Sequence, residues 1–388
     1  MTGIFWFEDR RDYHHTYNLL VVLPCLLLIA IGRTPLPPAQ ATRPLLTAVA
    51  AFIGWAALST LWLTDPATTS RSVSDMLRHA TAPIWLLFAA LSLGRCPAAQ
   101  LRAGLQFATV SAALSVLVFL VLHHVGNPGL AWWDNPDLRL IGFFGLQVNS
   151  LLTAHVIGFF VVVAAALAAQ QRLFWFAYTV LVAGLIACGA RTALIAVGMA
   201  TLVVLFGTMR ISRRLIFIGM LAITAGAVLL GDMLLARGLS YRPEIWLQAW
   251  QEILEHPWWG TGWGSAWHYR IAAQTHPVDA HNLTLAVWRD LGSVGLLLWL
   301  AIWIGAGIAV WRRRSTPLAK LALGLLSYGV LAGVTEGVAY LSRPKEHWFI
   351  IWLPLAISLV AIANPPHVDA ESQESQAPDQ NQTKLSET

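Results

Sequence analysis

Long apolar stretches alternate along this chain with shorter polar breaks. A stretch of about 17–25 predominantly apolar residues can cross the hydrocarbon core of a bilayer as a helix. Reading the chain for such stretches gives eleven candidate spans, at residues 17–32, 44–64, 80–94, 103–125, 141–169, 173–188, 190–207, 215–232, 294–310, 317–335 and 347–363. The pattern predicts an all-α polytopic membrane protein. Pro24 lies inside the first span, and a split or re-entrant segment there would raise the number to twelve.

Composition supports the same architecture. Of the 388 residues, 57% are hydrophobic and only 12% are charged, and one soluble core cannot hide that much apolar surface. The residues up to Tyr17 carry several charges and no small-residue cleavage site, so we expect the first helix to stay as an anchor. Cys25, Cys96 and Cys188 lack paired spacing, which favours buried thiols over disulfides or a thiolate metal site.

Arginine and lysine predict the side on which each loop lies, because loops rich in these residues are retained in the cytoplasm. Five alternate loops contain Arg or Lys and not one Asp or Glu, at residues 33–43, 95–102, 170–173, 208–214 and 311–320. The loops between them mix both signs, at residues 65–79, 126–140, 233–282 and 336–346. We expect the first set in the cytoplasm and the second in the periplasm of a bacterial inner membrane. Eleven spans then put the N-terminus outside and the tail inside, whereas twelve put both inside.

The polar breaks divide the chain into five parts. We expect an N-terminal segment (1–16), transmembrane helices with short loops (17–232), a periplasmic catalytic segment (233–293), further transmembrane helices (294–363) and a disordered cytoplasmic tail (364–388). The tail lacks the apolar residues that could offset the entropy of ordering it.

The outward segment 233–293 is the longest break in the apolar pattern. Its tryptophan rings favour the headgroup zone and predict a segment lying on the membrane surface; they are Trp246, Trp250, Trp258, Trp259, Trp263, Trp267 and Trp288. Apolar residues recurring every three or four positions predict an amphipathic helix over Pro243–Glu255.

Two further elements are expected in this segment. Gly260, Gly262 and Gly264 predict an open turn, in which the backbone either approaches a ligand closely or simply connects two elements. A short apolar helix is expected over 283–291, with a break at Gly292–Gly295 before the next span.

Histidine and arginine supply the candidate chemistry. His281 lies at the start of the short helix and precedes Asn282, so by itself it is more typical of a hydrogen-bonded cap than of a catalyst. Arg191 lies in a turn on the outward side, where a cation either meets an anion or snorkels to the surface. Other outward arginines are Arg237, Arg242, Arg270, Arg289 and Arg343.

These residue types together suit one kind of site. Guanidinium groups hold phosphate oxygens in a bidentate fork, and imidazole changes its charge near neutral pH. The set therefore predicts a site for a lipid-linked phosphate and a general base. No spacing typical of a metal site accompanies them, and we expect a metal-independent reaction.

Four runs of the outward segment, taken in order, resemble the signature of the O-antigen ligase and polymerase superfamily: Tyr241–Trp250, His256–Gly264, Ala280–Leu283 and Asp290–Leu296. With the turn at Arg191 and the multi-span plan, the resemblance extends over most of the chain. It implies a polytopic inner-membrane glycosyltransferase that takes a glycan from undecaprenyl diphosphate at the periplasmic face. In the ligase branch the glycan goes to the lipid A–core of lipopolysaccharide.

The resemblance also implies roles for single residues. His281 matches the family's essential histidine and would take the proton from the acceptor hydroxyl, and direct attack would invert the anomeric carbon. Arg191 and Arg242 match the arginines that hold the donor diphosphate. The residues expected around them are Arg270, His276, Asp279, Asn282 and Arg289. The implied partners are an undecaprenyl-diphosphate-linked O-polysaccharide donor, a lipid A–core acceptor and membrane lipids; we expect no cofactor, metal or nucleic acid.

Two other functions fit parts of the pattern. Repeat-unit polymerases share the signature, although one long outward segment favours the ligase over the two-loop plan often found in polymerases. A transporter for a lipid-linked sugar is expected to carry charges near the bilayer midplane and to contain inverted repeats. The sequence gives no clear sign of either feature.

Overall fold

The computed structural model describes residues 2–35, 39–63, 66–126, 138–141, 149–208, 241–271, 274–276, 279–337 and 339–364. Several predicted elements lie outside the described residues. They are the span 215–232, nearly all of the loop 208–214, most of the loop 126–140 and the tail beyond Asn364.

Helices make up almost all of the described structure. They are α1 (Arg10–Tyr17), α2 (Leu23–Ala30), α3 (Arg43–Ser59), α4 (Pro66–Leu93), α5 (Ala98–Gly126), α6 (Ser150–Ala168), α7 (Phe174–Ala187), α8 (Arg191–Thr208), α11 (Arg242–Glu255), α12 (Leu283–Trp311), α13 (Pro317–Gly333) and α14 (Trp352–Ala363). Seven helical segments are long and apolar enough to cross a membrane, and α7, α8 and α13 are shorter apolar helices. These ten coincide with ten of the eleven predicted spans, which confirms the all-α polytopic architecture.

The first predicted span is one continuous segment from Arg10 to Ala30, in which a π-helical turn over Asn18–Val22 joins α1 to α2. Pro24 lies in the first turn of α2. Proline removes one backbone hydrogen bond from a helix, yet the residues before Pro24 keep helical backbone angles and the segment stays helical past it. The split considered at Pro24 is therefore not present.

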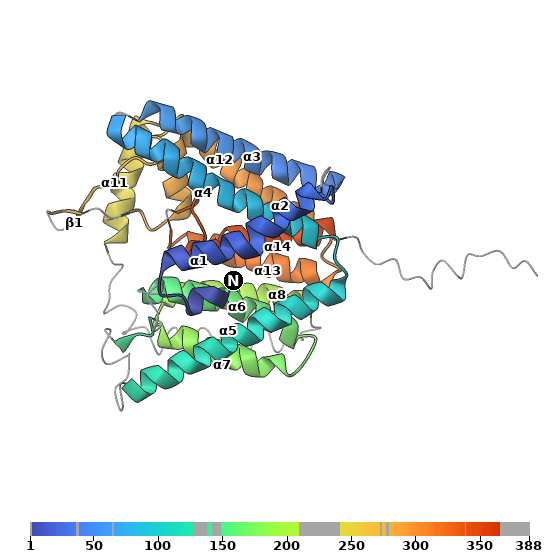
Figure 1. Cartoon of the computed structure of the whole chain (residues 1–388). Helices are drawn as coiled ribbons and strands as arrows, with labels where there is room; N and C mark the ends of the chain where they lie inside the picture. Colours follow the sequence, from blue (N-terminus) through green and yellow to red (C-terminus); the bar gives the residue numbers. More distant parts are fainter. Residues whose placement is uncertain are drawn as a thin grey trace, which may run out of the picture.

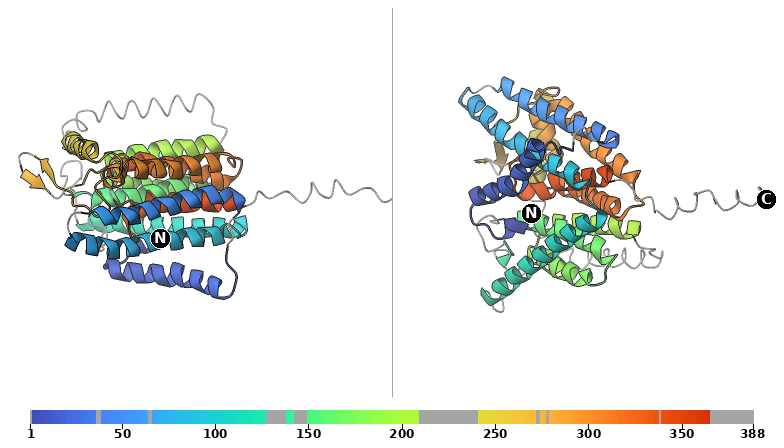
Figure 2. Two further views of the ribbon diagram at one scale, coloured as in Figure 1. Left: turned by 90° about the horizontal axis from the view of Figure 1, so that it is seen from above. Right: turned by 45° about the vertical axis from the view of Figure 1, so that its right-hand side comes forward.

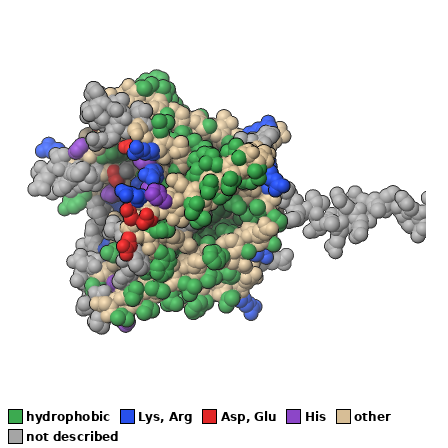
Figure 3. Space-filling view, in the orientation of Figure 1, with side chains coloured by type: hydrophobic (Ala, Val, Ile, Leu, Met, Phe, Trp, Pro, Cys, Tyr) green, Lys and Arg blue, Asp and Glu red, His purple; other side chains and the backbone are tan. Residues whose placement is uncertain are grey.

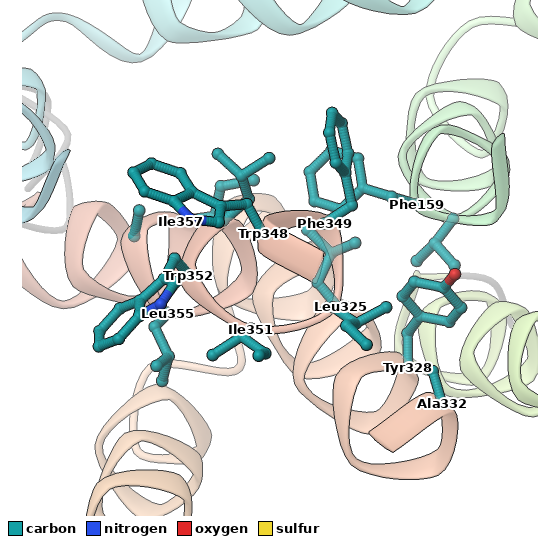
Figure 4. Close-up of a cluster of buried hydrophobic side chains, with 14 of the residues drawn as sticks. Phe159, Leu325, Tyr328, Ala332, Trp348, Phe349, Ile351, Trp352, Leu355 and Ile357 are labelled. Carbon is teal, nitrogen blue, oxygen red and sulfur yellow. The ribbon is translucent and has the colours of Figure 1, made fainter. Parts of the chain in front are cut away.

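The membrane helices run roughly parallel to one another, and α6, α13 and α14 lie at the centre of the bundle (Figures 1 and 2). Nearly every side chain of α6 and α14 is buried within the protein. In the core, Phe159 of α6 meets Phe349 edge to face, with ring centroids 5.4 Å apart, beside Leu325 and Tyr328 of α13 (Figure 4). By contrast, α2 and α5 lie on the outside and expose leucine and valine side chains. Such apolar surface suits contact with lipid.

The helix predicted over Pro243–Glu255 is α11, which begins one residue earlier and lies across the end of the bundle instead of along it (Figure 1). Beside it, β1 (Tyr269–Ile271) and β2 (Gln274–His276) form an antiparallel hairpin that the sequence analysis did not predict. The predicted short helix and the following span are joined in α12. Gly292 has φ 64° and ψ −170° there, so a kink lies at the predicted break.

The two ends of the bundle differ in charge. The end that carries α11 and the start of α12 gathers acidic, basic and histidine side chains, and we call it the His281 end (Figure 3). The opposite end, where α12 finishes beside Arg313, shows basic side chains without acidic ones on the face drawn in Figure 3. We call it the Arg313 end. This distribution matches the loop charges from which the two sides of the membrane were predicted.

Candidate functional site

His281 stands immediately before α12, in the segment that returns from the hairpin to the membrane helices. Its backbone has φ 45°, a conformation that residues other than glycine seldom adopt. Asp279 stabilises this turn, because its Oδ1 accepts a hydrogen bond of 2.8 Å from the His281 backbone N–H. The same oxygen lies 3.2 Å from Nδ1 of the imidazole. If Nδ1 carries the proton that faces this carboxylate, Nε2 keeps its lone pair, as a general base requires.

Asn282, and not His281, caps the helix. The Asn282 Oδ1 accepts a hydrogen bond of 3.0 Å from the backbone N–H of Leu285, as is typical of a residue at a helix N-terminus. The capping function that the sequence left open for His281 therefore belongs to its neighbour. The imidazole of His281 is 40% exposed, which leaves it accessible to a ligand.

The amphipathic helix α11 positions the His281 turn. Its apolar face buries Ile245 and Ala249 against Tyr269 of the hairpin and Ala280. In addition, Nε1 of Trp246 donates a hydrogen bond of 2.8 Å to the carbonyl oxygen of Ala280. The periodicity that predicted an apolar face on this helix thus corresponds to the surface that holds the residue before His281.

Arg242 begins α11 and donates a hydrogen bond to the carboxyl group of Glu336, which follows α13. Nη2 of Arg242 lies 3.1 Å from Oε1 of Glu336, and the two side chains are 22% and 5% exposed. Burial raises the pKa of Glu336 to about 8, the nearby Arg242 cation lowers it in part, and Asp279 raises it further. Near neutral pH Glu336 is therefore largely protonated, and Arg242 keeps positive charge that a bound phosphate can neutralise.

Arg191 is the first residue of α8 and is half-buried at the His281 end. Further along α8, the helices pack closely, since a Cβ at Gly158 of α6 would lie 2.7 Å from atoms of both Val197 of α8 and Tyr328 of α13. The structure thus brings Arg191, Arg242 and His281 to one end of the bundle, as the sequence analysis expected.

Arg289 is buried, and the printed contacts of its guanidinium are all with groups of the protein. Its guanidinium contacts Glu252 of α11 and Asp290, donates 2.7 Å to the carbonyl oxygen of Ala266, and lies over the ring of Trp267. It joins α11, the loop before the hairpin and α12, so its role is to hold the site together.

Two other expected residues lie on the hairpin. The Arg270 side chain is exposed, and its backbone N–H and C=O are both bonded to the side-chain amide of Gln248. This pair of bonds fixes the hairpin to α11. The backbone of His276 pairs with Tyr269, and its side chain lies outside the described residues.

The glycines of the predicted open turn approach protein backbone. A Cβ at Gly260 would lie 2.4 Å from the carbonyl oxygen of Asp290, and one at Gly262 would lie 2.7 Å from that of Ser59. The backbone N–H of Gly262 also donates to the carbonyl oxygen of Asp290. These two glycines therefore allow the turn to dock against the kinked helix α12 and the end of α3.

Sequence reasoning did not single out Glu336 or Lys345. Glu336 is 94 residues from Arg242, and only the fold makes them partners. Burial lowers the pKa of the Lys345 ammonium, whereas Glu346 and Asp279 raise it, so Lys345 lies within electrostatic range of the carboxylate that orients His281. Within the described part of the chain, no three His, Cys, Asp or Glu side chains are grouped so as to hold a metal ion.

Comparison with known proteins identifies the family of this chain. A family model described as O-antigen ligase matches residues 141–300, which include Arg191, Arg242 and His281. A curated O-antigen ligase from Pseudomonas aeruginosa is 34% identical over 363 residues, covering 92% of this chain and 87% of that protein. This chain belongs to the O-antigen ligase family. The resemblance found in the outward segment is thereby confirmed, and as a member of the O-antigen ligase family the chain is an enzyme of the glycosyltransferase type.

Proposed function

We propose that this enzyme transfers an O-antigen polysaccharide from undecaprenyl diphosphate to the lipid A–core of lipopolysaccharide, at the periplasmic face of the bacterial inner membrane. Membership of the O-antigen ligase family supports the class of substrate. The observation that carries the mechanism is the His281–Asp279 pair, an accessible imidazole whose Nδ1 faces a carboxylate at 3.2 Å.

In the proposed reaction, Nε2 of His281 accepts the proton of the acceptor hydroxyl. The oxygen attacks the anomeric carbon of the donor as the bond from that carbon to the diphosphate oxygen breaks. Attack from the face opposite the leaving group inverts the anomeric configuration. Asp279 stabilises the imidazolium that forms, in the manner of the carboxylate in a catalytic triad.

Arg242 and Arg191 carry the charge of the leaving group in this proposal. Negative charge builds on the diphosphate as the bond breaks, and fixed guanidinium groups beside it lower the energy of the transition state. Arg242 is suited to this role because its partner Glu336 has a raised pKa and neutralises it only in part. The proposed mechanism has no metal step.

The test is transfer of lipid-linked polysaccharide to rough lipopolysaccharide by the purified protein. We expect His281→Ala to reduce the initial rate by about 10²–10⁴-fold, the usual contribution of a general base. We expect Asp279→Asn to reduce it by about tenfold or more, because the imidazole loses its orienting carboxylate.

His268→Ala is the matched control, since His268 lies exposed in the same outward segment. It should retain the rate of the wild-type protein. Full transfer by a correctly folded His281→Ala protein would refute the assignment of the base. A deletion strain tests the reaction itself: unattached polymer is expected, whereas single repeat units on the core would indicate a polymerase.

A further inference from the structure

A second group of cations lies at the His281 end, apart from Arg191 and Arg242. It surrounds a cleft of about 440 Å³, which we call the Arg343 cleft. The cleft lies between α1, α4, the loop around Trp263–Trp267 and the segment that follows α13. The basic residues that line this cleft are Arg10, His14, His79, Arg343 and Lys345, and Asp290 is its one acidic lining residue. Asp290 is already bonded to Arg289 and Tyr340.

The cations of this cleft are poorly balanced by protein groups. No described residue forms an ion pair or a hydrogen bond with the Arg343 guanidinium. Burial and the nearby Arg78 cation both lower the pKa of Arg343. Among the described residues Arg78 forms an ion pair with Asp75 at 3.9 Å; the two side chains are 67% and 42% exposed, and such pairs contribute little. Neighbouring like charges disfavour each other's charged forms, and a bound anion would relieve this repulsion.

The cleft continues into a groove that faces the membrane. A second hollow of about 570 Å³ shares His14 and Arg343 with the cleft and also includes Arg78. It extends between the first membrane helix and α4, along Val22, Leu23, Leu26 and Trp85. Charged groups at one end and apolar side chains below them fit a lipid with an anionic head.

An apolar hollow also follows the opposite face of the first membrane helix. Its volume is about 350 Å³, and it runs along Leu20, Val21, Pro24 and Leu28, against α4 and α14. Two apolar grooves on either side of one helix suit a lipid with several acyl chains. A single polyprenyl chain would need only one of them.

The position of the cleft relative to His281 narrows the choice of lipid further. Neither Arg191 nor Arg242 lines the cleft. Lys345 does line it; burial lowers the pKa of its ammonium group, and Asp279, the partner of His281, opposes this lowering in part. Arg242, beside Glu336, and Lys345, in the cleft, are therefore two separate cations at the His281 end. A transferase that joins two membrane-anchored substrates needs two such sites beside one base.

We propose that the Arg343 cleft binds the phosphate groups of the acceptor glycolipid, and that the grooves along the first membrane helix hold its acyl chains. This assignment rests on the proposed function, which supplies a phosphorylated and acylated acceptor. Phosphate oxygens would accept charge-assisted hydrogen bonds from Arg343, Arg78 and Lys345. The acceptor hydroxyl would then reach His281 from the side opposite the donor diphosphate.

The experiment measures initial rates of the full-length protein while donor and acceptor concentrations are varied separately. The variant is Arg78→Gln with Arg343→Gln, and the control is Arg11→Gln, an exposed arginine on α1 outside the cleft lining. We expect the double variant to raise the KM for acceptor by about tenfold or more, the effect of losing charge-assisted contacts. Its KM for donor, and its kcat at saturating acceptor, should match those of the control.

A second arm uses an acceptor from which the phosphates have been removed. The wild-type KM should rise to the level of the double variant, and the double variant should not discriminate between the two acceptors. Leu23→Trp, which fills the groove without changing charge, should raise the KM for acceptor as well. An increase in the KM for donor, or no change in either constant, would overturn the proposal.

Equilibrium binding separates this inference from the proposed function. Purified wild-type protein in nanodiscs should bind phosphorylated lipid A more tightly than the double variant does, whether or not transfer occurs. Absence of transfer by the wild-type protein, with this binding difference intact, would refute the function and leave the site standing. Equal binding by both proteins would refute the site.

Discussion

Two hollows of equal volume, about 440 Å³ each, lie at opposite ends of the bundle. The one at the Arg313 end is lined by apolar and neutral polar residues, with Arg102 as its one charged lining residue. The Arg343 cleft at the His281 end combines three strong cations, two histidines and an aspartate. The two hollows therefore do not differ in volume. They differ in the number of titratable side chains that line them, which is larger in the Arg343 cleft.

Charged groups are also stabilised differently at the two ends. At the Arg313 end, Arg95 and Arg313 donate to backbone carbonyl oxygens, of Thr34 at 3.1 Å and Asn364 at 2.8 Å. At the His281 end, arginines meet carboxylates, and all the ion pairs found among the described residues lie there. Basic residues at the Arg313 end are those from which the sequence analysis predicted a cytoplasmic side. The His281 end holds charge in positions where it can act on a substrate.

The largest effect expected from this contrast is on stability. Arg289→Ala should lower the free energy of unfolding by about 3–5 kcal/mol, because it leaves Glu252 and Asp290 without their buried partner. Arg314→Ala, which removes an exposed guanidinium stacked on Trp311, should change it by less than about 1 kcal/mol. Chemical denaturation in detergent measures both. Equal losses would show that the two ends are stabilised alike.

Two glycines of α12 allow a smaller, matched test. Gly292→Ala should destabilise the protein by about 1–3 kcal/mol, since its φ of 64° and ψ of −170° belong to a region open only to glycine. A Cβ there would also lie 2.2 Å from the carbonyl oxygen of Trp258. Gly305→Ala has open space around it and should be neutral, or stabilising by up to about 1 kcal/mol. Thermal unfolding compares the two, and a Gly292→Ala protein as stable as the wild type would contradict the docking of the glycine turn.

A further expected effect is a pH dependence that belongs to the His281 end. Burial raises the pKa of Glu336 to about 8, so the folded protein keeps a proton that the unfolded chain releases near pH 4.5. The contribution of this group to stability is therefore greatest below pH 4.5 and is lost as the pH rises towards 8. Glu336→Gln should remove this pH dependence. Between pH 4.5 and 8, the free energy of unfolding should therefore fall in the wild-type protein more than in Glu336→Gln, as measured by chemical denaturation at a series of pH values.

The same titration should appear in catalysis. Above about pH 8 the ionised Glu336 neutralises Arg242 more fully, so the KM for donor should rise by a few-fold in the wild type and less in Glu336→Gln. Parallel pH profiles of the two proteins would indicate that Glu336 keeps one protonation state throughout.

Much of the fold follows from local pattern. The bilayer requires long apolar helices, and ten of the eleven predicted spans have helical counterparts within the described residues. The 3, 4 spacing over Pro243–Glu255 predicted α11, because a surface helix buries one face. The hairpin at Tyr269–His276 was not predicted, since its three-residue strands are too short for a visible alternation. The break at Gly292 was expected, but not its role as a docking point for Gly260.

Sequence alone determined which side chains carry the candidate chemistry. The order of its motifs selected His281, Arg242 and Arg191, and the structure gathers these at one end of the bundle. What only the tertiary structure decided is the partner of each charge. Arg289 is bound by Glu252 and Arg242 by Glu336, whereas Arg343 faces an open cleft. The physical reason is that the electrostatic energy of a charged side chain depends mainly on groups within a few ångströms of it. Here many of those groups are dozens of residues away from that side chain in the sequence.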